Sequence, residues 1–155
     1  MIDEFKIQLY CKHPNILPAY GFYIGQQECF LIMEAGVSNL YSKIKKEGCF
    51  SEEKAARYLF QIMKGISYLH LNGVIHRDIK PENIIVCGGD VLKISDFGWS
   101  VISNLERTTF CGTIDYVSPE VSSGRHYDNK IDCWSVGILA FEMILGYPPF
   151  PIKTM

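Results

Sequence analysis

The sequence of 155 residues lacks the patterns that mark several common protein classes. Its six cysteines form no Cys-x-x-Cys pair, so we interpret them as reduced thiols of an intracellular protein rather than as zinc ligands or a disulfide framework. Its formal net charge is only −2, and no basic cluster is longer than residues 43–46. This charge balance argues against nucleic acid or an anionic membrane surface as a partner.

Long apolar runs and targeting signals are also missing. The most apolar run, residues 133–147, includes Glu142 and falls short of the ~20 residues that a membrane-spanning helix needs. Residues 1–4 have no apolar core, so we expect no signal peptide at this end. Without repeats or low-complexity tracts, and with 48% hydrophobic residues, the sequence predicts one globular domain with a real core.

The first third of the chain predicts short elements separated by breaks. Pro14 forces His13 out of the helical region, so a helix must end before it. Two β-rich runs with a glycine-containing turn between them predict a β-hairpin. The predicted elements are a helix over residues 1–11, strands over residues 19–24 and 28–33 joined by a turn at 25–27, and a short helix capped by Ser38 or Asn39 that ends near residue 46.

The clearest local pattern is a helix that begins after Ser51 and ends at Asn72. Serine is a good N-cap, and apolar residues at spacings of three and four place one face toward the core. That face consists of Ala55, Leu59, Ile62, Ile66 and Leu69. The second half predicts strands over residues 84–86 and 91–94 joined at 88–90, a polar loop over 100–109, and a long helix capped by Asp128 or Asn129 and ended by Gly146, with the apolar stripe Ile131, Trp134, Ile138, Phe141 and Leu145.

Residues with phosphate and metal chemistry lie between these elements. His76 begins the pattern H-R-D-x-x-x-x-N, which ends at Asn83, and Asp96 begins a D-F-G triplet. Asp78 can accept the proton of an attacking hydroxyl, and Lys80 can reach a transferring phosphate. Asn83 and Asp96 are hard oxygen ligands that can hold Mg²⁺ against the phosphates of ATP. Each motif alone is a weak signal, but both in this order predict a phosphoryl-transfer site.

These motifs and the segments around them resemble eukaryotic protein kinases, most closely the Aurora family of mitotic serine/threonine kinases. Trp99, directly after the D-F-G triplet, is the most discriminating residue. The resemblance implies an α+β, kinase-like fold that is truncated, with a partial small lobe and the first part of a mainly helical large lobe. The implied division is a small-lobe remnant over residues 1–33 (the αC helix and two strands), a hinge over 34–38, and the large lobe over 39–155. The other matching segments are residues 13–17, 74–78, 96–101, 107–113 and 115–116.

The resemblance also implies roles for individual residues. Asp78 resembles the catalytic base, and Lys80 resembles the lysine that steadies the γ-phosphate and indicates serine/threonine substrates. Asn83 and Asp96 look like the metal ligands. The backbone of Glu34, Ala35 and Gly36 would meet the adenine of ATP, while the Glu34 side chain itself need not touch the nucleotide.

Further residues match the substrate-binding and regulatory positions of this family. Glu82, which is also a candidate cofactor-binding residue, resembles a residue that pairs with substrate arginine. That role favours protein substrates with basic residues near Ser/Thr. A plain surface glutamate is an equally compatible interpretation. Thr109 matches the activation-loop phosphosite, with Thr108 as the alternative, because a phosphate there could bond to Arg77. Glu4 matches the ion-pairing glutamate of the αC helix. Asp132 resembles the helix aspartate that holds the backbone of residues 76–77.

Two expected family motifs are not found in this sequence. It contains no G-x-G-x-x-G loop and no V-A-I-K-like run with a lysine for Glu4, and the arginine expected to pair with Glu120 is absent too. We therefore expect a fragment, or an incomplete gene model, of an active kinase. Alone, this chain should show little or no kinase activity, and an unpaired strand edge should make it aggregate.

Two other functional hypotheses stay open at this point. One is a non-catalytic, pseudokinase-like module that binds partner proteins; the intact Asp78, Asn83 and Asp96 argue against it. The other is a small-molecule phosphotransferase, against which the substrate-side run of residues 111–120 speaks. An upstream open frame that encodes the two missing motifs would decide for the enzyme. The resemblance further implies activating partner proteins and an intracellular location, in the nucleus or cytoplasm and at the spindle or centrosome.

Overall fold

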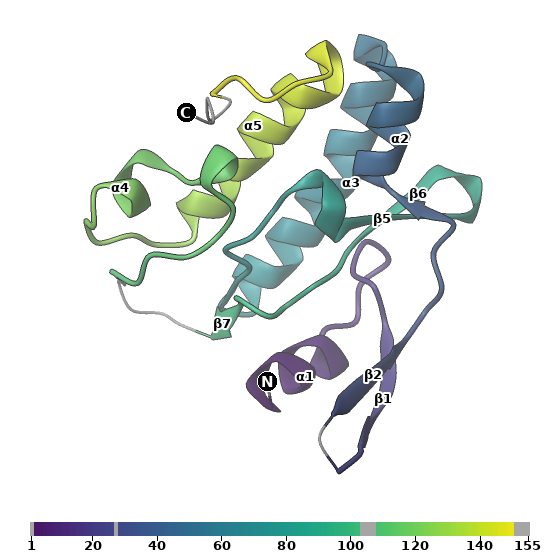
Figure 1. The fold of residues 1–155 in the computed structure, drawn as a ribbon, viewed down its shortest axis with the longest axis vertical. Helices are drawn as coiled ribbons and strands as arrows, with labels where there is room; N and C mark the ends of the chain where they lie inside the picture. The colour runs from purple at the N-terminus through teal and green to yellow at the C-terminus, as the bar shows by residue number, and fades with distance from the viewer. Residues whose placement is uncertain (1, 27, 103–107, 151–155) are drawn as a thin grey trace.

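A computed structural model describes residues 2–26, 28–102 and 108–150, with side chains from residue 5 onward. Figure 1 shows a helix and a β-hairpin at one end of the molecule and a mainly helical body at the other. This α+β arrangement agrees with the fold class that the sequence predicts. The turn at residues 25–27 and the polar loop at 100–109 are described only in part, because Gln27 and residues 103–107 lie outside the described residues.

The hairpin end consists of α1 (Ile2–Tyr10), β1 (Ala19–Ile24) and β2 (Cys29–Met33). The two strands are antiparallel neighbours, as their sequence pattern predicts. Phe5 of α1 stacks on Phe22 of β1, with ring centroids 5.8 Å apart. The helix therefore packs against the hairpin through an aromatic contact between residues that lie far apart in sequence.

The body begins with β3 (Ser38–Asn39) and α2 (Leu40–Glu47). The Asn39 carboxamide oxygen accepts a hydrogen bond of 2.9 Å from the Ser42 amide, so Asn39 is the N-cap. Ser38 instead lies opposite Val86 in a sheet, which decides between the two predicted caps.

Two long helices form the centre of the body. α3 (Glu52–Leu71) begins at Ser51, whose side-chain oxygen accepts from the Lys54 amide at 3.3 Å, as predicted. α5 (Lys130–Leu145) packs beside α3 and ends at Gly146, whose φ of +84° is the left-handed conformation that glycine adopts readily. The side chains of α3 that are buried in the core include Ala55, Tyr58, Ile62, Ile66 and Leu69.

Short strands carry the loops between these helices. β5 (Ile84–Cys87) lies between β3 and β6 (Val91–Ile94), and β4 (Val74–Ile75) pairs with β7 (Val101–Ile102). Within the predicted polar loop of residues 100–109, the apolar pair Val101–Ile102 therefore forms a strand instead. The remaining described elements are short: η1 (Pro81–Asn83), η2 (Gly88–Asp90), η3 (Ile114–Tyr116) and α4 (Pro119–Ser122).

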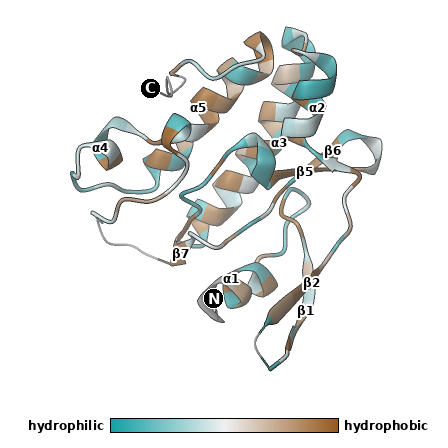
Figure 2. Cartoon of the chain, viewed as in Figure 1, coloured by the Kyte–Doolittle hydropathy of each residue, from teal (hydrophilic) through white to brown (hydrophobic). Residues whose placement is uncertain are grey.

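The predicted buried face of α5 is partly wrong. Trp134 is 36% exposed and Leu145 is 46% exposed, whereas Val136, Leu139 and Met143 are buried. Figure 2 shows hydrophobic residues along much of α5, so periodicity alone does not select one face. Within the described residues, no helix is both long enough and apolar enough to cross a membrane.

Candidate active site

The loop after β4 is held to the body by one buried carboxylate. Asp132 of α5 is 1% exposed and accepts hydrogen bonds from the backbone amides of His76 (2.9 Å) and Arg77 (2.8 Å). This confirms the role expected for Asp132. It also fixes Arg77 with a φ of +70°, a left-handed conformation that costs energy for a residue with a Cβ. His70 of α3, which the sequence did not point to, places its Nε2 2.8 Å from the same carboxylate.

His76 connects this loop to the D-F-G segment. Its Nε2 donates to the Ser95 carbonyl at 3.0 Å. Its ring packs edge-to-face against the Phe97 ring, with ring centroids 5.1 Å apart. Burial lowers the pKa of His76, and the nearby carboxylate of Asp132 opposes this shift only in part. The neutral ring thus holds the two motifs in a fixed relation.

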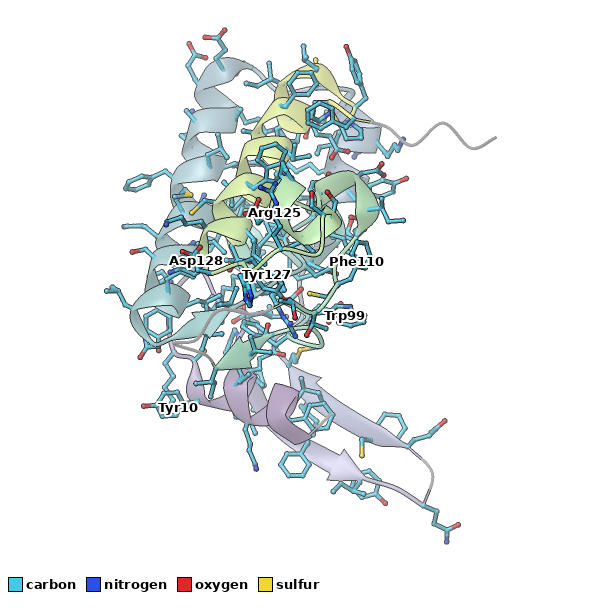
Figure 3. The ribbon with its side chains drawn as sticks, turned by 90° about the vertical axis from the view of Figure 1, so that its left-hand side faces the viewer. Tyr10, Trp99, Phe110, Arg125, Tyr127 and Asp128 are labelled. Atoms are coloured by element: carbon cyan, nitrogen blue, oxygen red, sulfur yellow. The ribbon has the colours of Figure 1, made fainter. Side chains whose placement is uncertain are left out.

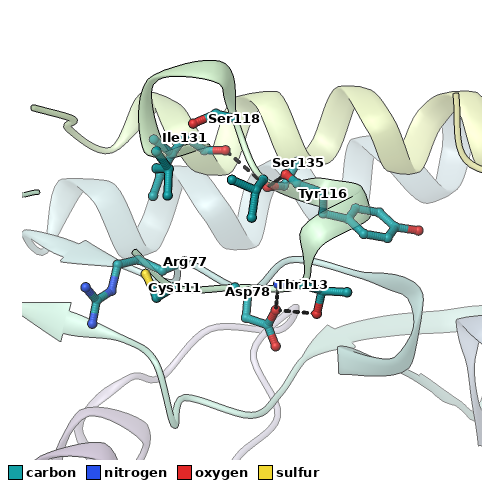
Figure 4. A pocket seen from close by; sticks show the side chains of 11 residues that line it. Arg77, Asp78, Cys111, Thr113, Tyr116, Ser118, Ile131 and Ser135 are labelled. Carbon is teal, nitrogen blue, oxygen red and sulfur yellow. Dashed lines mark hydrogen bonds between the residues drawn. The ribbon is translucent and has the colours of Figure 1, made fainter. Parts of the chain in front are cut away.

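Asp78 is the most heavily bonded side chain of the site. Its Oδ1 accepts from the amide (3.0 Å) and the hydroxyl (2.9 Å) of Thr113, as Figure 4 shows. Its Oδ2 lies 2.9 Å from Lys80 Nζ and accepts from Asn83 Nδ2 at 3.0 Å. Lys80 Nζ also donates to the Thr113 hydroxyl at 2.8 Å. Four donors therefore fill the lone pairs that a carboxylate offers.

These donors decide the charge of Asp78. The side chain is 3% exposed, and burial by itself would raise its pKa. The hydrogen bonds from Lys80 and Thr113 outweigh burial and hold the pKa below its usual value of 3.8. Asp78 is therefore ionised at neutral pH, and its four donors hold the carboxylate in one orientation.

Asn83 and Asp96 come together through Ser95. The Ser95 amide and hydroxyl donate to the Asn83 carbonyl at 2.9 and 3.0 Å, and Asp96 follows directly. Asn83 Nδ2 is directed at Asp78, which leaves its Oδ1 for another partner. Asp96 is exposed and left-handed, with φ +62°, and its Oδ1 accepts from the Gly98 amide at 3.2 Å. The predicted metal ligands thus present hard oxygens from adjoining backbone.

The segment predicted to meet adenine packs on the body sheet. The Glu34 carboxylate lies 2.6 and 2.8 Å from Lys93 Nζ of β6, and this bond lowers the pKa of Glu34. A Cβ on Gly36 would lie 2.1 Å from Ile85 Cγ2, so glycine is required there. In the part of the chain that the structure describes, the Glu34 carbonyl and the Gly36 amide form no hydrogen bond. Ala35 between them is exposed.

The comparisons with known proteins agree with this geometry. The family model described as protein kinase domain matches residues 1–155. The chain belongs to the protein kinase family. It is 44% identical over 150 residues to an Aurora kinase of Saccharomyces cerevisiae. The aligned region covers 95% of this chain and 41% of that protein.

Other relatives of this kinase chain carry similar names. It is 45% identical over 151 residues to the serine/threonine-protein kinase Aurora-2 of Arabidopsis thaliana, covering 97% of this chain and 54% of that protein. It is 43% identical over 149 residues to Aurora kinase B of Mus musculus, covering 95% and 43% respectively. The chain thus spans about half the length of these relatives or less, and the resemblance seen in the sequence is confirmed.

An acidic cluster of the kinase chain went unrecognised in the sequence. Glu142, the lone acid of α5's apolar run, is 7% exposed and accepts a hydrogen bond from the Tyr116 hydroxyl. Burial, together with the negative charges of Glu82 and Asp115, raises the pKa of Glu142 to about 7, although Lys45 opposes the shift. The sequence did contain one signal of this buried acid, because Glu142 interrupts an otherwise apolar helix. The exposed Glu82 therefore lies close enough to Glu142 for its charge to raise the pKa of that carboxyl.

Of the predicted regulatory residues, Arg77 is held by two hydrogen bonds of its guanidinium. Arg77 Nε donates to the Trp99 carbonyl at 2.6 Å, and its Nη1 donates to the Tyr127 hydroxyl at 3.0 Å. The side chains of Thr108 and Thr109 are exposed. The side chain of Glu4 lies outside the described residues, although its backbone belongs to α1.

A small cavity lies beneath the segment that bonds to Asp78. It has a volume of about 10 Å³ and lies between the predicted catalytic loop (residues 76–83), η3 and the start of α5 (Figure 4). Gly112 at its wall has a φ of +95°, and a Cβ there would come within 2.7 Å of the Arg77 carbonyl. Ser118 also lines it, and its buried hydroxyl finds no partner among the described residues.

Proposed function

We propose that this chain supplies the catalytic loop of a serine/threonine protein kinase, which transfers the γ-phosphate of ATP to a hydroxyl of a protein substrate. The observation that carries the proposal is the Asp78 carboxylate, ionised and oriented by Lys80, Thr113 and Asn83. A buried carboxylate with a low pKa, beside a mobile cation, is suited to orienting a hydroxyl near a phosphate.

The bonding of Asp78 suggests how a substrate hydroxyl gains access. All four acceptor positions of the carboxylate are taken, so one donor must leave before a hydroxyl can donate. Lys80 is the donor with the longest flexible side chain, and its ammonium also contacts Thr113. When Lys80 turns toward a phosphate, it frees Oδ2 of Asp78 for the hydroxyl. Charge stabilisation and base exposure are thereby coupled in one residue.

The residues present fit a divalent cation and a nucleotide. Asn83 Oδ1 and the Asp96 carboxylate are the hard oxygens that would hold Mg²⁺, which would neutralise phosphate charge when bound. The Glu34 carbonyl and the Gly36 amide would receive the adenine edge, since Glu34's side chain is bonded to Lys93. Their positions are fixed by the close packing of Gly36 on Ile85.

The substrate preference that we propose is for proteins with basic residues near the target Ser/Thr. Glu82 is exposed next to the catalytic loop, and its charge is felt by the buried Glu142. An arginine side chain placed between them would relieve the repulsion and stabilise both carboxylates. By similarity to the Aurora kinases, we further propose a mitotic role at the spindle or centrosome, controlled by phosphorylation of Thr109 and by activating partner proteins.

The activity proposed for the chain by itself is low. Its sequence lacks a G-x-G-x-x-G loop and the lysine expected to pair with Glu4, so two groups that hold phosphates in line are missing. By analogy with the removal of single preorganised donors, each loss costs a factor on the order of 10²–10³ in rate.

A chimaera tests the function without this handicap. Residues 1–150 replace the matching segment of the S. cerevisiae Aurora kinase, and phosphate transfer to a basic serine peptide is measured. We expect transfer, and we expect Asp78→Asn to reduce kcat by at least about 10²-fold. Asp128→Asn, which makes the same change at an exposed aspartate, is the matched control. Full activity of the Asp78→Asn chimaera would refute the proposal.

One observation favours a partner-binding module as a second candidate. The β1–β2 hairpin exposes several large apolar side chains that need cover: Tyr20, Phe22, Tyr23, Ile24, Phe30, Ile32 and Met33. If the chimaera is folded but inactive, binding of partners through this hairpin becomes the better account.

A further inference from the structure

One buried hydroxyl joins the catalytic loop to the segment that carries Thr109. The Tyr127 hydroxyl accepts from Arg77 Nη1 at 3.0 Å and donates to the Thr109 carbonyl at 2.9 Å. Cys111 Sγ lies 3.8 Å from the same oxygen. The hydroxyl therefore uses its only donor on the backbone of Thr109 and an acceptor position on Arg77. In the view of Figure 3, Tyr127 lies between Arg125 and Trp99.

Tyr127 and Arg77 are both anchored in the body. Tyr127 is 3% exposed and belongs to a small core cluster with Ile75, Val121 and Ile131. Arg77 is fixed by Asp132 through its amide and by Trp99 through its guanidinium. Thr109, by contrast, has an exposed side chain. The tyrosine hydroxyl is thus a fixed point to which the Thr109 backbone is tied.

We propose that Tyr127 is a positioning residue that holds the backbone of Thr109 beside Arg77, so that a phosphate on Thr109 lies within reach of the Arg77 guanidinium. This inference rests on the proposed regulation through Thr109. Before phosphorylation, Tyr127 also keeps the guanidinium oriented by accepting from Nη1. After phosphorylation, the hydroxyl retains the Thr109 carbonyl while Arg77 bonds to the phosphate. Tyr127 thereby limits the entropy that the loop loses when the phosphate binds.

The experiment uses the whole chain with phosphothreonine incorporated at position 109. The rate at which a non-specific phosphatase removes the phosphate reports how well it is held, and the ³¹P chemical shift reports its contact with a cation. In Tyr127→Phe, which keeps the ring and loses the hydroxyl, we expect removal to be about 3- to 10-fold faster, the factor that one hydrogen bond accounts for. The ³¹P shift should move toward that of free phosphothreonine.

Tyr10→Phe is the matched control, because Tyr10 is 75% exposed and distant from Tyr127 in Figure 3. It should behave as wild type. A Tyr127→Phe rate equal to the Tyr10→Phe rate would overturn the inference. Arg77→Gln tests the underlying function separately, since faster removal in this variant alone would support the Arg77–phosphate contact and contradict a role for Tyr127.

A second variant covers the case in which Tyr127→Phe does not fold. A backbone ester between Thr109 and Phe110 weakens the Thr109 carbonyl as an acceptor and changes no side chain. If Tyr127 acts through this carbonyl, the ester should speed phosphate removal to the same degree as loss of the hydroxyl. An ester chain with the wild-type rate and ³¹P shift would also refute the proposal.

Discussion

At the scale of single residues, the site depends on contacts between segments that lie far apart in the chain, such as the hydrogen bonds from Thr113 to Asp78. The distinctive spacing of the motifs predicts Asp78, Asn83 and Asp96 as site residues, and their roles stay a prediction. Thr113 was not found as the second partner of Asp78, since 35 residues separate them and no local pattern joins them. Glu142 was missed for a related reason: its burial depends on packing, and its pKa depends on carboxylates from two other segments.

The buried Glu142 makes stability depend on pH. Its pKa is raised from 4.5 to about 7, so the folded chain holds this proton where the unfolded chain has lost it. Stability from this group is therefore complete below pH 4.5 and falls as the pH rises toward 7. Between pH 4.5 and 7, we expect this group to lower the free energy of unfolding of the wild-type chain by on the order of 1–3 kcal/mol. In Glu142→Gln, which has no carboxyl at this position, that decrease should be absent.

Urea denaturation at a series of pH values measures this effect. The exposed Glu28→Gln serves as control and should leave the slope unchanged. A slope in Glu142→Gln identical to that of wild type would show that the carboxyl titrates normally.

Gly112 supplies a second prediction at this scale. Its left-handed φ and its closeness to the Arg77 carbonyl leave no room for a Cβ. Gly112→Ala should lower the free energy of unfolding by on the order of 2 kcal/mol. Gly88→Ala is the control, because a Cβ at that position meets nothing within 4 Å. Equal urea midpoints for the two variants would contradict the steric argument.

At the scale of elements, the sequence predicted helices and strands well where period and cap agreed. α3 followed from a serine cap and a regular apolar stripe. The buried face of α5 did not follow, because apolar residues surround that helix and only packing selects Val136 and Leu139 over Trp134. The pairing of β7 with β4 was not predicted, since it depends on contacts between residues 26 to 28 positions apart and not on local pattern.

The cap of α2 gives a test at this scale. Asn39 accepts from the Ser42 amide, whereas Ser38 caps nothing in the described structure. Asn39→Ala should therefore lower the free energy of unfolding by about 1 kcal/mol, and Ser38→Ala should change it by less than about 0.5 kcal/mol. Thermal unfolding of both variants checks this. A larger loss of stability in Ser38→Ala than in Asn39→Ala would show that Ser38, and not Asn39, caps the helix.

At the scale of the whole molecule, the two ends of the structure differ in how well they are covered. The helical body buries a continuous core around α3, while the β1–β2 hairpin leaves apolar side chains exposed on both strands. The division at residues 34–38 stays a prediction, because it rests on resemblance and not on a measured property of the chain. Exposure of the hairpin agrees with the expected tendency to aggregate.

Replacing Ile24 and Ile32 with lysine should reduce that tendency. Both side chains are more than half exposed, so the double variant should keep its melting temperature while light scattering at a given concentration falls. Leu71→Lys is the control, because Leu71 is 85% exposed but lies at the end of α3. Equal scattering from the double variant and wild type would show that another surface drives association.

The central claim is that Asp78, Asn83 and Asp96 form one phosphoryl-transfer site, and a paramagnetic ion tests it most directly. Mn²⁺ substitutes for Mg²⁺ and broadens the NMR signals of nearby amides. With Mn²⁺ and ATP together, the amides of Asn83, Asp96 and Gly98 should broaden first, and Asp96→Ala should abolish the effect. Broadening centred elsewhere, such as around Glu82 and Glu142, or broadening that persists in Asp96→Ala, would contradict the account.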